Sequence, residues 1–269
     1  MITVNIEPEY VASVFGISIT NTLVTSVLVS CLLVLGALVF YLTRNKRHNL
    51  IATGLRIAVY ELLKLADMVT GDRELSKKAL PLIATFFLFI VTANLIALLP
   101  GFLGSLFVHT QNGELSLLRS PDSDLSTTVV LALISVGAIQ FFSIRTLGIK
   151  QYLMRFLNFA NPIAFILGLF EIISEGVKVL SFSFRLFGNI FAGETLLLII
   201  TFLVPYFIPV PFMVLEVFVG VIQAFIFTTL ALTFIKIGTI RREDKNSADN
   251  ENADAPIIKQ HSPMSLPLT

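Results

Sequence analysis

The sequence predicts an all-α integral membrane protein of about five membrane-crossing helices, the last two long and strongly tilted, with an additional amphipathic helix on the inner surface. Of its 269 residues, 55% are hydrophobic and only 14% are charged, whereas soluble domains carry about 25% charged residues. A helix crosses the bilayer core, about 30 Å thick, with roughly 20 apolar residues. Runs of about this length or longer cover residues 23–42, 81–99, 125–144, 162–203 and 208–237.

These runs belong to a single predicted membrane domain, residues 23–240. Residues 1–22 precede it as an outer N-terminal segment. Residues 241–269 are polar, proline-containing and aperiodic, which predicts a disordered cytoplasmic tail. Between the first two runs, the segment LIATGLRIAVYELLKLADMV places its apolar residues on one side of a helix. We expect that helix to lie on the inner surface of the membrane.

Basic residues in the loops predict the orientation, because Lys and Arg are enriched on the cytoplasmic side of membrane proteins. No Lys or Arg precedes the first run, whereas the connection 43–80 contains eight. The loop 101–124 contains one, and the loop 145–161 contains three. This alternation predicts an outer N-terminus and a cytoplasmic C-terminus. A cleaved signal peptide is disfavoured, because no basic segment precedes the first run and that run is too long.

Composition and motifs argue against several functions. The net charge of +1 gives no basic footprint for nucleic acid. The single cysteine, Cys31, cannot form an internal disulfide, and no Cys/His spacing is typical of a metal site. We therefore expect neither a metal nor a cofactor. The chain also lacks a phosphate loop of the G-x-x-x-x-G-K-[ST] kind, so any ATP chemistry would belong to partner proteins.

The fourth run carries charges that a membrane helix rarely tolerates. As one helix it would be about 60 Å long, twice the bilayer core, so it must tilt strongly or break. Each charge costs about 2.5–3.5 kcal/mol at the centre of a membrane helix. Five of the polar residues share one narrow stripe along the helix: Glu171, Glu175, Lys178, Arg185 and Asn189. Glu194 lies about 140° around the helix axis from this stripe, if the helix is regular there.

The last run repeats this pattern, with Glu216, Gly220, Gln223 and Phe227 on one face. Polar residues of two neighbouring membrane helices indicate an intramembrane polar pathway. A purely structural interpretation remains open. In it, Lys178 snorkels and pairs with Glu171 and Glu175, and Arg185 forms a packing ion pair with Glu216 or Glu194. Two isolated amides, Asn94 and Gln140, are expected to make ordinary hydrogen bonds between helices.

One stretch of the stripe carries a family resemblance. The segment SFRLFGNIFAGE, residues 183–194, resembles the signature of subunit a of the F-type ATP synthase membrane sector. The motifs NLIALLPG at 94–101, PDSDLSTT at 121–128 and GVIQAFIF at 220–227 support it, and the resemblance covers roughly residues 45–240. The sequence departs from the family at Ser126, where Asn is common.

The resemblance implies the stator of a rotary ion motor in a bacterial inner membrane. Two offset half-channels and an essential arginine, matched by Arg185, would couple H⁺ flow to rotation of a ring of c subunits. The expected partners are that ring, whose carboxylate would face Arg185, the peripheral stalk b subunits and the catalytic head. This chain would not be an enzyme. Asn189 would orient or hydrate the arginine. Glu194, Glu216 and Gln223 match the outer half-channel, and Glu171, Glu175 and Lys178 match the inner one.

Two other functions predict different features. An independent proton- or anion-coupled secondary transporter would show repeats with paired broken helices, and the two halves of this sequence differ in span length, loop length and charge. A structural scaffold would not require five aligned polar residues. Whether the ion is H⁺ or Na⁺ depends largely on the ring site, which this chain does not contain.

Overall fold

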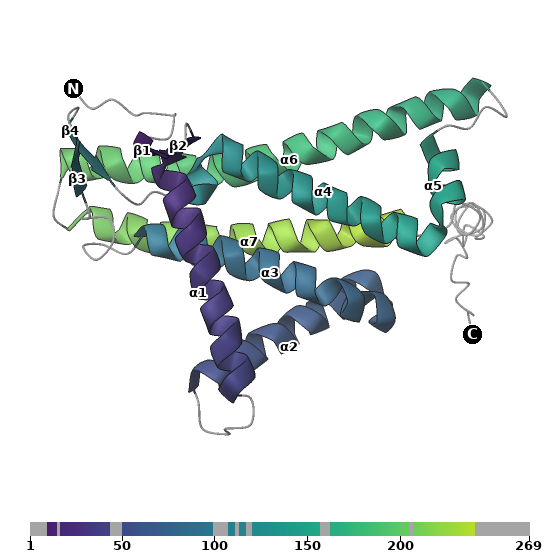
Figure 1. The fold of residues 1–269 in the computed structure, drawn as a ribbon, viewed down its shortest axis with the longest axis horizontal. Helices are drawn as coiled ribbons and strands as arrows, with labels where there is room; N and C mark the ends of the chain where they lie inside the picture. Colours follow the sequence, from purple (N-terminus) through teal and green to yellow (C-terminus); the bar gives the residue numbers. More distant parts are fainter. Residues whose placement is uncertain are drawn as a thin grey trace, which may run out of the picture.

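Seven α-helices make up most of the part of the chain that the computed structural model describes (Figure 1). That part comprises residues 10–14, 17–43, 50–98, 107–110, 113–116, 120–156, 162–204 and 207–239. Five of the helices are long and apolar enough to cross a membrane, which confirms the predicted all-α membrane fold. The helices are α1 (Asn21–Thr43), α2 (Leu50–Thr70), α3 (Arg73–Leu98), α4 (Leu125–Leu147), α5 (Ile149–Phe156), α6 (Pro162–Leu203) and α7 (Pro209–Thr239).

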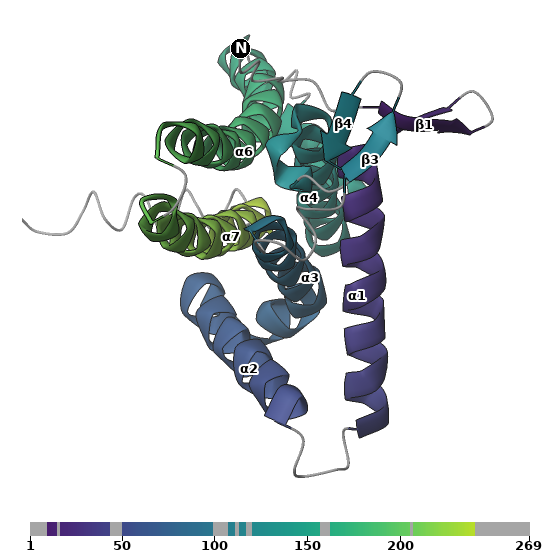
Figure 2. The same ribbon diagram turned by 90° about the vertical axis from the view of Figure 1, so that its left-hand side faces the viewer.

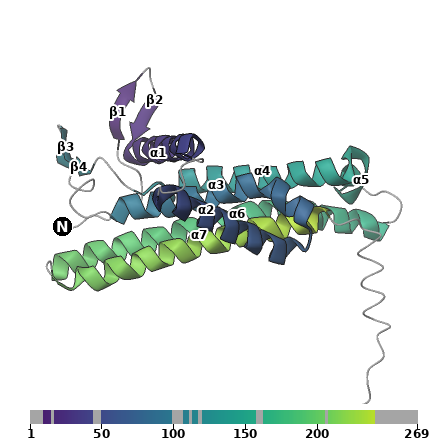
Figure 3. The same cartoon turned by 90° about the horizontal axis from the view of Figure 1, so that it is seen from below.

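The two longest helices, α6 and α7, lie side by side along the long axis of the molecule, and α1 runs across them (Figures 1 and 3). At 1.5 Å per residue, the 42 residues of α6 extend about 63 Å and the 31 residues of α7 about 46 Å. The bilayer core is only about 30 Å thick. Because α6 is continuous over its whole length, we expect it to fit the membrane by tilting and not by breaking.

The second membrane helix begins earlier than its apolar run. α3 starts at Arg73, whereas the run predicted a start near Pro81. The Asp72 side chain accepts a hydrogen bond from the backbone N–H of Glu74 at 2.8 Å, which satisfies one of the unpaired donors at the start of a helix. Glu74 also lies in the first turn, where a negative charge interacts favourably with the helix dipole. Capping therefore extends the helix over a charged segment that hydropathy excludes.

Four short strands form two antiparallel hairpins that the apolar runs did not predict. Each hairpin pairs only neighbouring segments, so it adds local structure to an otherwise helical chain. The predicted amphipathic helix is present as α2, with Leu62 and Ala66 buried and Tyr60 exposed. The predicted tail, residues 241–269, lies outside the described residues. The strands are β1 (Tyr10–Val14), β2 (Ile17–Thr20), β3 (Phe107–Thr110) and β4 (Gly113–Ser116).

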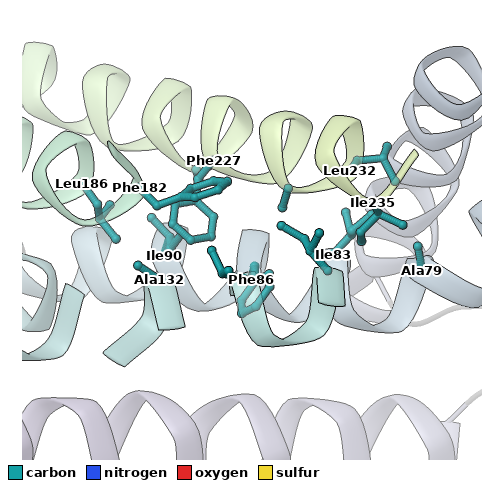
Figure 4. Packing of buried hydrophobic residues seen from close by; sticks show 14 of the residues in the cluster. Ala79, Ile83, Phe86, Ile90, Ala132, Phe182, Leu186, Phe227, Leu232 and Ile235 are labelled. Atoms are coloured by element: carbon teal, nitrogen blue, oxygen red, sulfur yellow. The ribbon is translucent and has the colours of Figure 1, made fainter. Parts of the chain in front are cut away.

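The core lies where α3, α4, α6 and α7 meet (Figure 4). Phe227 of α7 packs against Phe86 of α3 and Phe182 of α6, with ring centroids 5.6 Å and 4.8 Å apart. These contacts turn one side of α6 inward. On its other side Val177 and Phe184 are each 55% exposed. α6 and α7 form one edge of the bundle and α1 the opposite edge (Figure 2).

A short 3₁₀ helix, η1 (Pro121–Ser123), packs against α6, α4, α3 and α1. The next residue, Asp124, caps α4 by accepting a hydrogen bond from the backbone N–H of Ser126 at 2.9 Å. Its second carboxylate oxygen accepts a hydrogen bond from the Thr22 hydroxyl at 3.0 Å. Asp124 therefore ties α1 to the start of α4.

Replacing Gly168 with alanine should destabilise the packing of α5 on α6. A Cβ atom at Gly168 would collide with the backbone oxygen of Phe156, and backbone cannot rotate out of the way as a side chain can. Overpacking a well-filled site typically costs about 1–3 kcal/mol. We expect a lower melting temperature for the purified complex carrying Gly168→Ala.

Gly137→Ala is the matched control, because a Cβ at Gly137 of α4 meets nothing within 4 Å. Alanine is favoured over glycine in a helix by about 1 kcal/mol, so this variant should melt at the same temperature as the wild type or slightly higher. Equal melting temperatures for Gly168→Ala and the wild type would contradict the predicted clash.

Candidate functional site

Arg185 lies near the middle of α6 and is partly exposed. One guanidinium nitrogen donates a hydrogen bond to the hydroxyl of Ser181, one turn earlier, at 3.3 Å. No carboxylate of the described residues lies within ion-pair distance of it. The packing ion pair of Arg185 with Glu194 or Glu216, which the structural interpretation required, is therefore absent from this part of the chain. The positive charge remains available to a group outside the chain.

Asn189 follows Arg185 by one turn and connects the two long helices. Its side-chain nitrogen donates a hydrogen bond to the side-chain oxygen of Gln223 on α7, at 2.6 Å. Gln223 is buried, whereas Asn189 is exposed. This bond fixes the register of α6 against α7 next to Arg185.

Beyond Asn189, toward the end of α6, the two helices and α3 line a small, partly open cavity with room for about one water molecule. Glu194 of α6 and Glu216 of α7 both line it, as do Asn94 and Ser120. The Ser120 hydroxyl donates a hydrogen bond to the Asn94 side-chain oxygen at 3.4 Å. The two acids, 22 residues apart in sequence, thus share one polar space.

The close approach of Glu216 to α6 depends on Gly193. A Cβ atom there would lie 3.0 Å from a carboxylate oxygen of Glu216. The other carboxylate oxygen of Glu216 and the side-chain nitrogen of Asn94 are buried and have no partner in the described structure. Buried polar atoms usually bind protein groups or ordered water. These atoms therefore favour a hydrated cavity.

At the other end of α6, the acids of the stripe are paired with cations. Glu171 forms an ion pair with Arg155 of α5. Glu175 forms an ion pair with Lys178 at 2.7 Å, and the Lys178 ammonium lies 5.1 Å from the centre of the Phe234 ring of α7. The structural interpretation paired Glu171 and Glu175 with Lys178. For Glu171 that pairing is wrong, because its carboxylate pairs with Arg155 of α5 instead.

α5 contributes a second polar residue to this end. The Tyr152 hydroxyl donates a hydrogen bond to the side-chain oxygen of Gln140 on α4, at 2.9 Å. Burial raises the pKa of Tyr152, and the nearby Glu175 raises it further; the charge of Arg155 offsets part of this increase. The expected hydrogen bond between helices is thus present for Gln140, whereas the partner of Asn94 is Ser120, the residue that precedes η1.

The predicted site residues divide into three groups along α6. Arg185, Asn189 and Gln223 meet at the centre, Glu194 and Glu216 share the cavity, and Glu171, Glu175 and Lys178 lie at the end next to α5. The sequence interpretation missed Arg155 and Tyr152 because it treated residues 145–161 as a loop. The apolar residues of IKQYLMRF recur at helical spacing, and that signal could have identified α5. Among the described residues, no cluster of His, Cys, Asp and Glu could hold a metal ion.

Known proteins resemble this chain over most of its length. The family described as ATP synthase A chain matches residues 23–236. The ATP synthase subunit a of Moorella thermoacetica is 32% identical over 235 residues, which cover 86% of this chain and 96% of that protein. The chloroplastic ATP synthase subunit a of Oedogonium cardiacum is 37% identical over 215 residues, 78% of this chain and 80% of its own length. The ATP synthase subunit a of Legionella pneumophila is 29% identical over 246 residues, covering 90% and 96%.

Proposed function

The chain belongs to the ATP synthase A chain family, and from this membership we propose that it is the stator of the proton channel. In this function, two offset half-channels and Arg185 couple the flow of H⁺ across the membrane to rotation of a ring of c subunits. Rotation drives ATP synthesis in the catalytic head. Peripheral stalk b subunits hold the stator against the turning ring. The chain itself performs no catalysis, and the chemistry of ATP belongs to its partners.

The structural observation that best supports this proposal is the exposure of Arg185 and its lack of an ion-pair partner among the described residues. Its guanidinium is partly exposed and has no carboxylate of the described residues within ion-pair distance, on a helix whose outer side is apolar and open. An opposite charge within about 4–6 Å lowers the pKa of a carboxylate by about 1–3 units. A ring carboxylate that passes Arg185 therefore releases its proton there. Because arginine stays charged, with a pKa above 12, the same residue blocks direct passage of protons.

Glu194 and Glu216 form the outer half-channel in this proposal. They share the cavity with Asn94 and Ser120, and the unpartnered buried polar atoms support hydration of that space. Two neighbouring carboxyls exchange protons as a coupled pair. Gln223 and Asn189, joined by their hydrogen bond, stand between this cavity and Arg185.

The inner half-channel begins at the opposite end of α6. Glu171 and Glu175 are both acids within the apolar helix, each held by one cation, Arg155 or Lys178. These cations offset the cost of placing acidic side chains within an apolar helix. In the proposed orientation the N-terminus lies outside and the C-terminus in the cytoplasm of a bacterial inner membrane, so this end opens to the cytoplasm.

Inverted vesicles that carry the assembled complex test the function. ATP addition should acidify their lumen, and vesicles whose complex lacks this chain should hydrolyse ATP without acidification. The purified full chain alone in liposomes provides the control. A stator gives no substrate-dependent flux without the ring, whereas flux of a proton- or anion-coupled substrate through the chain alone would overturn the proposal in favour of a secondary transporter.

A further inference from the structure

A buried carboxyl near the outer cavity has no role in the mechanism above. Asp122 lies in η1 and its residue is 0% exposed. Both of its carboxyl oxygens are buried and neither has a hydrogen-bond partner in the described structure. Both carboxylate oxygens of the neighbouring Asp124, in contrast, have partners. One accepts a hydrogen bond from the backbone N–H of Ser126 and so caps α4, and the other accepts a hydrogen bond from the Thr22 hydroxyl. Asp124 has an evident structural function, and Asp122 does not.

The surroundings of Asp122 connect it to the outer cavity. Ser120, two residues before Asp122, lines that cavity. The 3₁₀ helix η1 itself packs against α6, α3, α4 and α1. Glu194, which also lines the cavity, acts electrostatically on the Asp122 carboxyl. Among the described residues, the titratable groups on the elements around Asp122 are Glu194 from α6, Asp124 at the start of α4 and, across the cavity, Glu216 from α7. α3 and α1 contribute the uncharged Asn94 and Thr22.

Burial, and after it the charge of Glu194, raises the pKa of Asp122 from 3.8 to about 8. A carboxyl with a pKa in this range can bind and release protons at ordinary pH, whereas an acid in water stays ionised. A strongly perturbed pKa in a buried group close to a polar cavity makes that group a candidate for a functional site.

We propose that Asp122 is a third proton-exchanging carboxyl of the outer half-channel, acting before Glu194 and Glu216 on the inward path. Because Asp122 is 0% exposed, a proton from the outer side reaches its carboxylate only through intervening water or side chains, and binds there. It then passes to water in the cavity, which restores the Asp122 carboxylate, and onward to Glu194 or Glu216. This inference rests on the proposed stator function and extends it.

The opposing explanation is that Asp122 remains permanently protonated and only fills space. Asp122→Asn distinguishes the two, because asparagine has nearly the same shape and no charge but cannot exchange a proton. If Asp122 carries protons, this variant should assemble normally and pump several-fold more slowly. If Asp122 only fills space, the variant should pump like the wild type, which would overturn the proposal.

ATP-driven pumping runs the same path in reverse, so that protons leave through the outer half-channel into the lumen of inverted vesicles. The experiment measures the initial pumping rate with the lumenal pH set below, at and above 8. In the wild type, the rate should change across this range as Asp122 titrates, and Asp122→Asn should flatten that change. Ser123→Ala is the matched control in the same 3₁₀ helix and should retain both the rate and the profile. If Asp122→Asn fails to assemble, Asp122→Glu decides, because a displaced carboxyl should shift the midpoint of the profile. An unshifted midpoint would overturn the proposal.

Arg185→Ala, measured in the same vesicles, separates the two levels of inference. If Arg185→Ala fails to pump while Asp122→Asn pumps like the wild type, the stator function stands and the role of Asp122 falls. If Arg185→Ala pumps normally, the stator function itself is contradicted.

Discussion

Replacing Arg185 with alanine should abolish ATP-driven proton pumping while the complex still assembles. The side chain is partly exposed and does not belong to the buried core, and its hydrogen bond is to Ser181 one turn earlier, so its loss should leave the core intact. Without the guanidinium, the ring carboxylate loses a favourable shift of about 1–3 pKa units at the point of proton release. The barrier between the two half-channels is lost as well, and we expect a passive proton leak.

The measurement compares lumenal acidification of inverted vesicles carrying the wild-type or the Arg185→Ala complex, with and without Na⁺. Lys178→Ala is the matched control, because it removes another cation of the same helix that is already paired with Glu175. We expect it to slow pumping only mildly. Pumping that requires Na⁺ would identify Na⁺ as the ion carried. If the Arg185→Ala complex pumped at the wild-type rate, Arg185 would not be required for proton transport and its role would be structural.

The second large effect is expected from the outer cavity. Glu194→Gln and Glu216→Gln should each slow coupled transport, and the double variant should nearly stop it. Glutamine preserves size and hydrogen bonding but cannot exchange a proton, and either remaining acid can serve the shared cavity in part. Since the two carboxyls act as a coupled pair, the effects should not be additive.

Coupled rates of the two single variants and the double variant give the interaction between the acids directly. Glu74→Gln serves as the control, because Glu74 is an exposed acid in the first turn of α3, far along the chain from the cavity residues. It should leave the rate unchanged. Wild-type rates in the double variant would remove both acids from the proton path.

Much of the fold could be predicted because the membrane imposes strict rules on the sequence. Apolar run length identified all five spans, and for α6 the expected bounds, 162–203, agree with the structure. Helical geometry alone also placed Glu194 away from the stripe that contains Arg185 and Asn189. In the structure it lines a cavity with Glu216 of α7.

Features that depend on tertiary contacts could not be predicted in this way. The pairing of Glu171 with Arg155 requires α5 to fold back on α6, which no local pattern specifies. The burial of Asp122 results from the packing of several helices around η1, whereas in the sequence it is one acid of a polar, proline-containing loop. Hydropathy treats such a loop as exposed. Polar residues that become buried only through packing are therefore the ones that sequence reasoning misses.

The tilt of α6 has a further geometric consequence. Glu171 and Glu194 are 23 residues apart, or about 35 Å along the helix axis. If α6 stood upright, almost all of this length would be depth, and the two acids would lie above one another like the ends of a straight pore. Tilting converts part of the length into displacement parallel to the membrane surface. In the proposed stator function, a cylindrical partner turns against this helix, and the displacement is an arc of its circumference. An ion that enters near one acid would then leave near the other only after the partner has rotated.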